Sequence, residues 1–299
     1  MRTEAAASPA FLEVKVAIII DGRKVAAEVR ARVLEGSREF TAKYGRAPSL
    51  TVIRVGDDPA SAVYVRNKMR ACEEVGFVSE CCHLPADISD KALLEEIEKR
   101  NNDDEVDGIL LQLPIPRGLD EAGAIAAIAS EKDVDAFGNL DAGHLCFSDS
   151  EILPCTPSGI MELLRSYDIP ISGCECVVIG RSNIVGRPMA ALLLAADGTV
   201  TVCHSRTRDL GEVTRRADIL VSAVGRAGLV TADMVKPGVT VIDVGMNRNA
   251  EGKLCGDVDF ASVEPVAGYI TPVPGGVGPM TVAMLMQNTL TAARRRKAK

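Results

Sequence analysis

The stretch that decides the fold covers residues 174–188 and reads CECVVIGRSNIVGRP. An apolar run ends at Gly180, a polar turn follows, and Pro188 stands where the first turn of a helix would begin. A strand followed by a helix N-terminus can present backbone N–H groups to a pyrophosphate, because that end of a helix carries partial positive charge. The spacing departs from G-x-G-x-x-G, since the next glycine after Gly180 is Gly186. The stretch predicts a nucleotide-binding βα unit, with an ordinary strand-to-helix turn as the alternative.

The β-branched strand that begins at Thr199 ends in polar residues suited to a phosphate. It follows the glycine turn by about 20 residues, where a dinucleotide-binding unit places its ribose contact, and NAD-specific sites usually carry an acid there. This chain instead offers His204, Ser205 and Arg206, with Arg181 in the turn. Such donors suit a ribose 2′-phosphate better than a bare diol, so we predict NADP as the cofactor. For any single arginine the alternative is a solvated charge at a strand end.

Further apolar runs indicate an α/β fold. Residues 218–225 and 239–245 are continuous apolar runs ending in glycine, typical of central parallel strands covered on both faces. The first half of the chain shows the same rhythm, and Asp58-Pro59 predicts the N-terminus of its second helix. There we predict helices over 22–44, 59–75 and 91–99 and strands over 49–55, 77–84 and 106–113.

The length of 299 residues suggests about two domains. No low-complexity linker separates them, but two prolines in Leu153-Pro-Cys-Thr-Pro157 stop one segment and open a helix over 158–167. We therefore predict a first domain over residues 1–154 and a dinucleotide-binding domain over 155–279.

Composition argues against nucleic-acid and membrane partners. The net charge is −7, aromatic residues make up 3% and there is no Trp, so neither a basic face nor stacking platforms for bases are predicted. No apolar stretch reaches the roughly 18 residues of a membrane span. The first ten residues lack an apolar signal core and contain an acid, so we expect a cytoplasmic location. Nine cysteines and three histidines without a CxxC pattern predict buried thiols in a reducing compartment and no metal site.

Several polar side chains interrupt the apolar pattern of the first domain. Tyr64 and Lys68 are four residues apart on one predicted helix, so they lie on the same face. Gln112 interrupts the strand Gly108 to Pro114, and Asp135 lies in a loop after a helix. A lysine next to a tyrosine and an amide could move protons. The alternatives are a solvated helix lysine for Lys68 and a strand-end amide for Gln112.

Six motifs in order make the chain resemble the bifunctional methylenetetrahydrofolate dehydrogenase/cyclohydrolase (FolD-type) family over residues 16–290. They are Tyr64-Val-Arg-Asn-Lys68, Asp107-Gly-Ile-Leu-Leu-Gln112, Lys132-Asp-Val-Asp135, Pro154-Cys-Thr-Pro157, Gly180-Arg-Ser182-x-Ile-Val-Gly186 and Thr271-Pro-Val-Pro-Gly-Gly-Val-Gly-Pro279.

The resemblance implies a fold and an activity. An N-terminal α/β domain, completed by a C-terminal helix within 280–299, would pack beside a Rossmann-type NAD(P)-binding domain, with folate in the cleft between them. The enzyme would oxidise 5,10-methylenetetrahydrofolate with NADP+ and hydrolyse the 5,10-methenyl product to 10-formyltetrahydrofolate, in the one-carbon metabolism that feeds purine biosynthesis. Its substrate would be a tetrahydrofolate derivative, with or without a polyglutamate tail. A homodimer would form through the second domain, and residues 200–208 are our candidate contact because an edge strand needs cover.

The resemblance also implies roles for single residues. Lys68 would be the key catalytic group, and Gln112 would position it and influence its protonation. Tyr64 would stack on the p-aminobenzoyl ring and help to orient Lys68, and Asp135 would bind the pterin amino and ring N–H groups. The remaining substrate-binding residues would be Leu111, Leu113, Pro272, Pro274, Gly275 and Gly276. The cofactor would contact Gly180, Arg181, Ser182, Ile184, His204, Ser205, Arg206 and Met246.

The sequence departs from the family pattern after Asp135. The family commonly has glycine at the next position, whereas this chain has Ala136, and the segment 137–144 lacks the usual histidine-proline pair. Alanine adds one methyl group and should be tolerated unless this position needs a positive φ.

Two other classes of protein are alternatives. Another Rossmann dehydrogenase that acts on a small acid such as shikimate would share residues 176–245, but it gives no reason for Tyr64, Lys68 and Gln112 together. A non-catalytic dinucleotide-sensing protein would keep the cofactor half and leave Lys68 free to vary. The intact Lys68 and Gln112 count against this second alternative.

Overall fold

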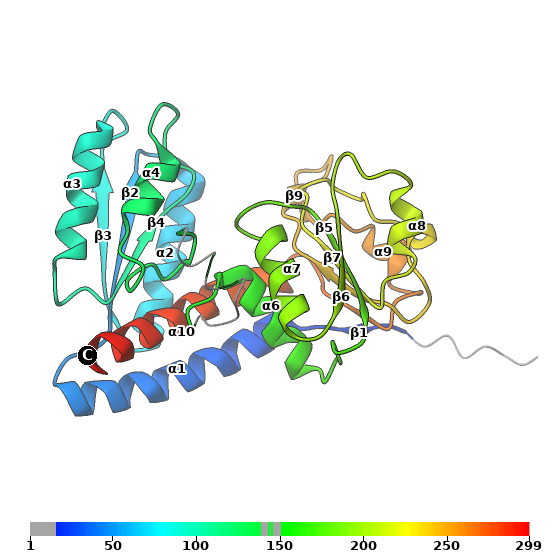
Figure 1. Ribbon diagram of the computed structural model, residues 1–299, viewed down its shortest axis with the longest axis horizontal. Coiled ribbons are helices and arrows are strands. Elements are labelled where there is room, and N and C mark those ends of the chain that lie inside the picture. The colour runs from blue at the N-terminus through cyan, green and yellow to red at the C-terminus, as the bar shows by residue number, and fades with distance from the viewer. Residues whose placement is uncertain (1–15, 139–142, 144, 146–150, 299) are drawn as a thin grey trace, which may run out of the picture.

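The computed structural model describes residues 16–138, 143, 145 and 151–298. Two lobes, each built on a parallel sheet, are joined by two long helices, α1 (Gly22–Tyr44) and α10 (Val277–Ala298). These helices pack along each other beneath the first lobe and reach toward the second (Figure 1). The α/β class and the two-lobed organisation predicted from the sequence are confirmed. The limits of the domains at 154 and 279 stay a prediction.

The first lobe holds a three-stranded sheet in the order β3-β2-β4. All pairs are parallel, with Val52 of the central strand opposite Cys81 and Leu110. Its strands are β2 (Ser49–Val55), β3 (Val78–Leu84) and β4 (Gly108–Leu111), and its helices are α2 (Pro59–Glu74), α3 (Asp90–Asn101) and α4 (Glu121–Ala127).

The second lobe holds a six-stranded parallel sheet in the order β1-β11-β8-β7-β5-β6. The strands are β1 (Ile18–Ile19), β5 (Glu175–Ile179), β6 (Thr199–Cys203), β7 (Ile219–Ser222), β8 (Thr240–Asp243) and β11 (Tyr269–Ile270). The helices are α6 (Cys155–Ser166), α7 (Gly186–Ala195), α8 (Leu210–Thr214), α9 (Phe260–Val263) and the 3₁₀ helix η1 (Ala232–Met234), and β9 (Asn247–Arg248) pairs with β10 (Leu254–Cys255).

The strand order of the second lobe fixes where a ligand can bind. The chain leaves β5 to form β6 on one side and returns to form β7 on the other. In open parallel sheets, ligands bind outside the carboxyl ends of the strands at such a switch point. Gly180 and Ala223 directly follow β5 and β7, so the glycine turn predicted from the sequence borders this point.

Local sequence signals start and stop the helices that matter for function. Asp58 accepts a 2.7 Å hydrogen bond from the backbone N–H of Ser61, and Pro59 occupies the first turn of α2. The chain leaves α2 through Gly76, whose φ of 73° suits glycine. The last helix begins at Val277, three residues before the range 280–299 predicted for it, because Pro279 is tolerated within the first turn.

One hydrophobic cluster continues through both lobes. It contains Val52 of the first sheet, Val33 of α1, Leu163 of α6, Met280 of α10 and Val178 of the second sheet, each less than 5% exposed. The two long helices and α6 therefore carry the core from one lobe into the other, which fixes the lobes relative to each other.

A buried ion pair fastens the end of α10 to the first lobe. Asp107 is fully buried and accepts two 2.7 Å hydrogen bonds from the Arg46 guanidinium, another from the Ser49 N–H at 3.0 Å and one from Arg296 at 3.3 Å. The hydrogen bond to Asp107 raises the pKa of Arg46. A structural anchor is therefore the role of the aspartate that opens the motif Asp107 to Gln112.

None of the described helices is long and apolar enough to cross a membrane.

Candidate active site

Lys68 and Gln112 meet at the carboxyl end of the first sheet. The Lys68 Nζ donates a 3.0 Å hydrogen bond to the Gln112 Oε1. Gln112 directly follows β4, so it lies just after the strand that was predicted to contain it. Its backbone N–H donates to the Ile53 carbonyl at 2.8 Å, and its Nε2 donates to the Leu113 carbonyl at 2.6 Å. Because the amide nitrogen has its own acceptor, the buried amide keeps its oxygen toward the ammonium group.

Asp135 lies within electrostatic reach of Lys68. Burial raises the pKa of this carboxyl, and the charge of Lys68 and a hydrogen bond from Cys155 oppose that rise. The Cys155 Sγ lies 3.6 Å from the Asp135 Oδ1 and 3.4 Å from the Val134 carbonyl oxygen. Burial raises the pKa of Cys155 well above its ordinary value, so it stays a thiol that can donate. Asn288 of α10 holds the same segment by donating to the Val134 carbonyl at 2.8 Å.

The carboxylate of Asp133 shapes the turn that presents Asp135. It accepts four backbone N–H groups, from Asp135, Ala136, Phe137 and Gly138, at 2.9–3.2 Å. Within this turn Ala136 has a φ of 56°, so the position does need the left-handed conformation in which glycine would be free of strain. For alanine that conformation costs about 1–2 kcal/mol, which the four hydrogen bonds oppose. Of the unusual segment 137–144, positions 139–142 and 144 lie outside the described residues.

Tyr64 reaches across from α2 to the second lobe. Its hydroxyl lies 3.7 Å from the Met246 Sδ, and its side chain is 43% exposed. Met246 follows β8 and is 55% exposed. The two side chains therefore face each other at the boundary between the lobes, and Tyr64 stays partly exposed there.

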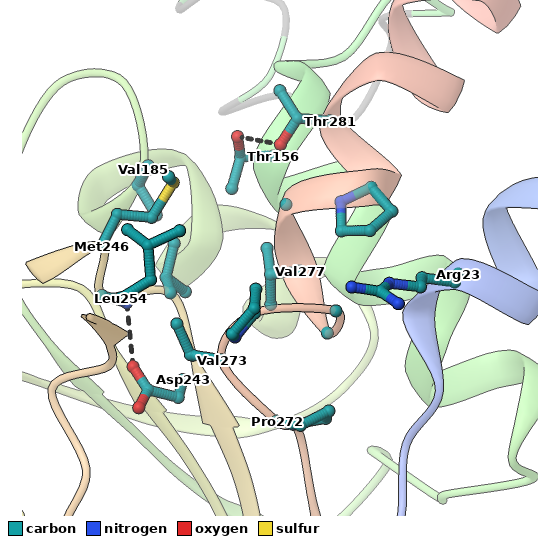
Figure 2. Close-up of a pocket in the computed structure, with 17 residues that line it drawn as sticks. Arg23, Thr156, Val185, Asp243, Met246, Leu254, Pro272, Val273, Val277 and Thr281 are labelled. Atoms are coloured by element: carbon teal, nitrogen blue, oxygen red, sulfur yellow. Dashed lines mark hydrogen bonds between the residues drawn. The ribbon is translucent and has the colours of Figure 1, made fainter.

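A cavity of about 260 Å³ lies where the proline-glycine loop meets the two long helices. It is lined by the predicted substrate residues Pro272, Pro274, Gly275 and Gly276, by Met246 of the predicted cofactor set, and by Arg23. Figure 2 shows Arg23 reaching toward the loop from one side, with Met246 and Leu254 on the other. The loop approaches α1 so closely that a Cβ on Gly22 would lie 1.7 Å from the Gly276 carbonyl oxygen. Arg23 was not predicted, since in sequence it is one helix arginine among many.

A second cavity, of about 400 Å³, lies at the switch point of the six-stranded sheet. Gly180, Arg181, His204 and Ser205 of the predicted cofactor set line it. A Cβ on Gly180, whose φ is 124°, would lie 2.4 Å from the Ala223 carbonyl oxygen, so only glycine fits this turn. Two unpredicted polar residues, Thr207 and Arg226, also line the cavity. The sequence signal for Arg226 is its place directly after the apolar run that ends in Gly225.

The remaining predicted residues lie elsewhere. The Ser182 Oγ accepts the N–H groups of Val185 and Gly186, so it caps the start of α7. Leu113 and Ile184 line a cavity of about 220 Å³ between the lobes. Leu111 is 4% exposed within the core. Arg206 is exposed and outside the lining of the second cavity, and its N–H donates to the His204 Nδ1. Their roles stay predictions.

These features define a class of protein. The second cavity fits a dinucleotide, because it combines a glycine turn without room for a Cβ with arginine, histidine and serine donors at a switch point. The first lobe adds a fixed lysine–amide pair and a partly buried aspartate. Together they define a two-domain, nucleotide-dependent dehydrogenase whose first lobe carries a hydrogen-bonded lysine–amide pair of its own.

Comparison with known proteins gives the family. Residues 20–135 match the model of the tetrahydrofolate dehydrogenase/cyclohydrolase catalytic domain, and residues 154–297 match that of its NAD(P)-binding domain. The chain belongs to the tetrahydrofolate dehydrogenase/cyclohydrolase family.

Relatives cover nearly the whole chain. The bifunctional protein FolD of Burkholderia pseudomallei is 56% identical over 282 residues, which are 94% of this chain and 99% of the relative. The FolD crystal structure from Campylobacter jejuni is 47% identical with a TM-score of 0.92, covering 94% of this chain and 99% of that one. FolD of Trypanosoma brucei, complexed with NADP cofactor and inhibitor, is 40% identical with a TM-score of 0.91, covering 95% and 100%. A shikimate dehydrogenase from Thermus thermophilus shares the fold alone. It is 17% identical with a TM-score of 0.50, covering 83% of this chain and 99% of that one.

Proposed function

We propose that this protein oxidises 5,10-methylenetetrahydrofolate to 5,10-methenyltetrahydrofolate with NADP+ and then hydrolyses the product to 10-formyltetrahydrofolate. The observation that carries the proposal is the Lys68–Gln112 pair beside Asp135, in a chain that matches both family domains. The shikimate-type alternative has no use for this pair.

The second cavity would hold the cofactor. Arg181 and Arg226, together with His204 and Ser205, offer charged and polar donors to a 2′-phosphate, and Gly180 lets a pyrophosphate approach the backbone. NADP+, when bound, accepts a hydride from the methylene carbon. The NADP-bound FolD of Trypanosoma brucei supports this choice of cofactor.

The folate would lie at the boundary between the lobes. Asp135 would accept the amino and ring N–H groups of the pterin, and the exposed ring of Tyr64 would pack against the p-aminobenzoyl ring. The loop 272–276 would cover the ligand, because Gly275 and Gly276 present backbone without side chains. These contacts would align the methylene carbon with the cofactor cavity, which is the main contribution of a protein to hydride transfer.

Lys68 would move the protons of the hydrolytic step. Addition of water to the methenyl carbon releases a proton, and cleavage of the bond between that carbon and N5 requires a proton at N5, while the added hydroxyl gives its remaining proton to solvent as it becomes the formyl carbonyl. The Lys68 Nζ can take up the first and deliver the second, while Gln112 fixes its position through the 3.0 Å hydrogen bond. Cys155 remains a thiol and orients the Asp135 carboxylate.

Assembly and cellular setting complete the proposal. The protein would form a homodimer through the edge strand β6, where Val202 and the neighbouring Leu194 of α7 are exposed. The free thiols of the described cysteines support a reducing, cytoplasmic setting. There the enzyme would supply one-carbon units, including those of purine biosynthesis, from folates with or without polyglutamate tails.

The proposal is tested by two assays on the purified chain. Formation of methenyltetrahydrofolate is followed with NADP+ and with NAD+, and hydrolysis of methenyltetrahydrofolate is followed without cofactor. We expect both activities. A folded protein that lacks either one would contradict the bifunctional assignment.

A further inference from the structure

Two buried aspartates lie behind the cofactor cavity. Asp257 is completely buried, and its carboxylate accepts five hydrogen bonds. The donors are the backbone N–H groups of Val224 (2.8 Å), Gly225 (3.3 Å) and Arg226 (2.8 Å), the Ser222 Oγ (3.2 Å) and the Asn247 Nδ2 (2.9 Å). Every donor lies at or just beyond the carboxyl end of β7 or β8.

Asp243, the last residue of β8, holds Asp257 in place. Its carboxylate accepts the backbone N–H groups of Gly245, Asp257 and Val258, each at 2.9 Å. The surrounding backbone is shaped to fit both carboxylates. A Cβ on Gly245 would lie 2.3 Å from the Asp257 Oδ1, and one on Gly256 would lie 1.8 Å from the Asp243 Oδ2. Asp243 itself lines the first cavity (Figure 2).

The segments that Asp257 holds border both cavities. Val224 and Arg226 line the cofactor cavity, and Asn247 directly follows Met246, which lines the cavity beside the proline-glycine loop. Asp257 lines neither cavity. A single buried carboxylate thus connects the wall of one cavity to the wall of the other.

We propose that Asp257 is a positioning residue for the dinucleotide, fixing the loop 223–226, which lines the cofactor cavity, relative to the segment 244–247, which carries Met246 of the predicted cofactor set. This inference rests on the proposed function. Binding sites gain affinity when their contacts are fixed before the ligand arrives, because less conformational entropy is lost on binding. Without the carboxylate, three consecutive N–H groups lose their common acceptor, and the two walls become independent.

The test exploits the two activities of the chain, because only the dehydrogenase needs cofactor. In Asp257→Asn the shape is kept, but an NH2 group replaces one acceptor. We expect the Kd for NADPH, followed by its own fluorescence, to rise about tenfold or more, a change typical of a lost charged hydrogen bond. The KM for NADP+ should rise in parallel, while cofactor-free hydrolysis of methenyltetrahydrofolate stays within about twofold of the wild type.

Asp218→Asn is the matched control. Asp218 lies at the opposite end of the same sheet, where it accepts the Glu175 N–H at 2.8 Å and pairs with Lys236. This variant also loses part of a hydrogen-bonded carboxylate in the second lobe, but it should bind NADPH like the wild type. Tm values of all variants, and binding measured well below them, separate weak binding from unfolding. If Asp257→Asn is insoluble, Asn247→Ala replaces it as the test. This variant removes one hydrogen-bond donor to Asp257 on a partly exposed residue, and it should still weaken NADPH binding.

Two outcomes would overturn the role of Asp257. One is an unchanged Kd for NADPH in a folded Asp257→Asn variant, or in Asn247→Ala where that variant decides. The other is an equal loss of hydrolysis and of cofactor binding, which would mean a structural role only. A wild-type chain that binds no NADPH would instead overturn the proposed function.

Discussion

The Lys68 Nζ and the Gln112 Oε1 lie 3.0 Å apart, one on a helix and the other directly after a strand of the first lobe. Gln112 is 8% exposed, and its backbone N–H and its Nε2 each donate a further hydrogen bond, so it offers the lysine a fixed acceptor. A flexible lysine is thereby held in one place, within electrostatic reach of Asp135.

Replacing Lys68 with Met keeps the length of the side chain and removes its proton-carrying group. Hydrolysis of methenyltetrahydrofolate should fall by about 10² or more, the usual scale for a general acid or base. Lys91→Met is the control, because Lys91 is a lysine in the first turn of α3 whose side chain is 86% exposed. A Lys68→Met variant that hydrolyses at nearly the parent rate, after subtraction of the uncatalysed reaction, would show Lys68 to be a structural helix residue.

The enzyme should prefer NADP over NAD. One charge-assisted contact to the 2′-phosphate is worth about 1.5–3 kcal/mol, or about one to two decades in kcat/KM. Arg181→Gln should reduce kcat/KM with NADP+ and leave the value with NAD+ nearly unchanged, because NAD+ lacks that phosphate. Arg187→Gln provides the comparison, since Arg187 is exposed on α7 and outside the cavity lining. Equal or NAD-favouring values in the wild type would refute the preference.

Asp107→Asn should destabilise the fold strongly. The change leaves the Arg46 guanidinium, which is 16% exposed in its side chain, without its buried anionic partner, so that only the exposed Glu105 remains, 3.8 Å away. Breaking such a buried pair costs about 3 kcal/mol or more, which urea unfolding can measure. Asp104→Asn is a matched control, because Asp104 also pairs with an arginine, Arg296 at 3.2 Å, but its side chain is 98% exposed. That variant should lose less than about 1 kcal/mol. Similar losses in both variants would contradict the anchoring role of Asp107.

The stability contributed by Asp243 should fall as the pH rises. Burial raises the pKa of its carboxyl from 3.8 to about 6, against the effect of three backbone N–H donors. Between these two pKa values the folded state therefore binds more protons than the unfolded state. The contribution of Asp243 to stability is thus largest below the pKa of the unfolded state, and it is lost as the pH rises through the pKa of the folded state. Between about pH 5 and pH 7.5 the loss is about 1 kcal/mol.

Urea unfolding of Asp243→Asn checks this sign. The Asn side chain does not titrate, so its stability relative to the wild type should improve by about 1 kcal/mol from about pH 5 to pH 7.5. Asp259→Asn, at an exposed aspartate nearby, should follow the wild type at both pH values. If the stability of Asp243→Asn relative to the wild type stays constant or falls as the pH rises, a raised pKa of Asp243 is ruled out.

The homodimer should be visible by light scattering at micromolar concentration. Val202 lies on the edge strand β6 and is 39% exposed, and Leu194 is 65% exposed. Val202→Lys places a charge on this edge and should shift the mass toward that of a monomer. Val78→Lys, on β3 of the first lobe and 60% exposed, should leave the mass unchanged. A monomeric wild type would contradict the predicted dimer contact at residues 200–208.

Local sequence signals were sufficient for much of the fold. Asp58-Pro59 marked the start of α2 because a capping aspartate and a proline act within one turn. The apolar runs ending in Gly180, Gly225 and Gly245 marked central strands because both faces of such strands are covered. Tyr64 and Lys68 could be placed on one helix face because helix periodicity is local, and their link to Gln112 came from the family motifs rather than from spacing.

The sequence alone could not place residues whose partners lie far along the chain. Nothing local distinguishes Asp257 from any other aspartate, yet it gathers donors from the ends of two strands. Arg226 and Arg23 join their cavities only once the loops are folded against the helices. Likewise β1 pairs with β11 of the second lobe, although residues 18–19 precede the first domain's helix, because strand pairing depends on which edge is free in space. Periodicity and caps act over a few residues and can be read from sequence, whereas buried carboxylates and cavity walls depend on backbone groups that only tertiary packing brings together.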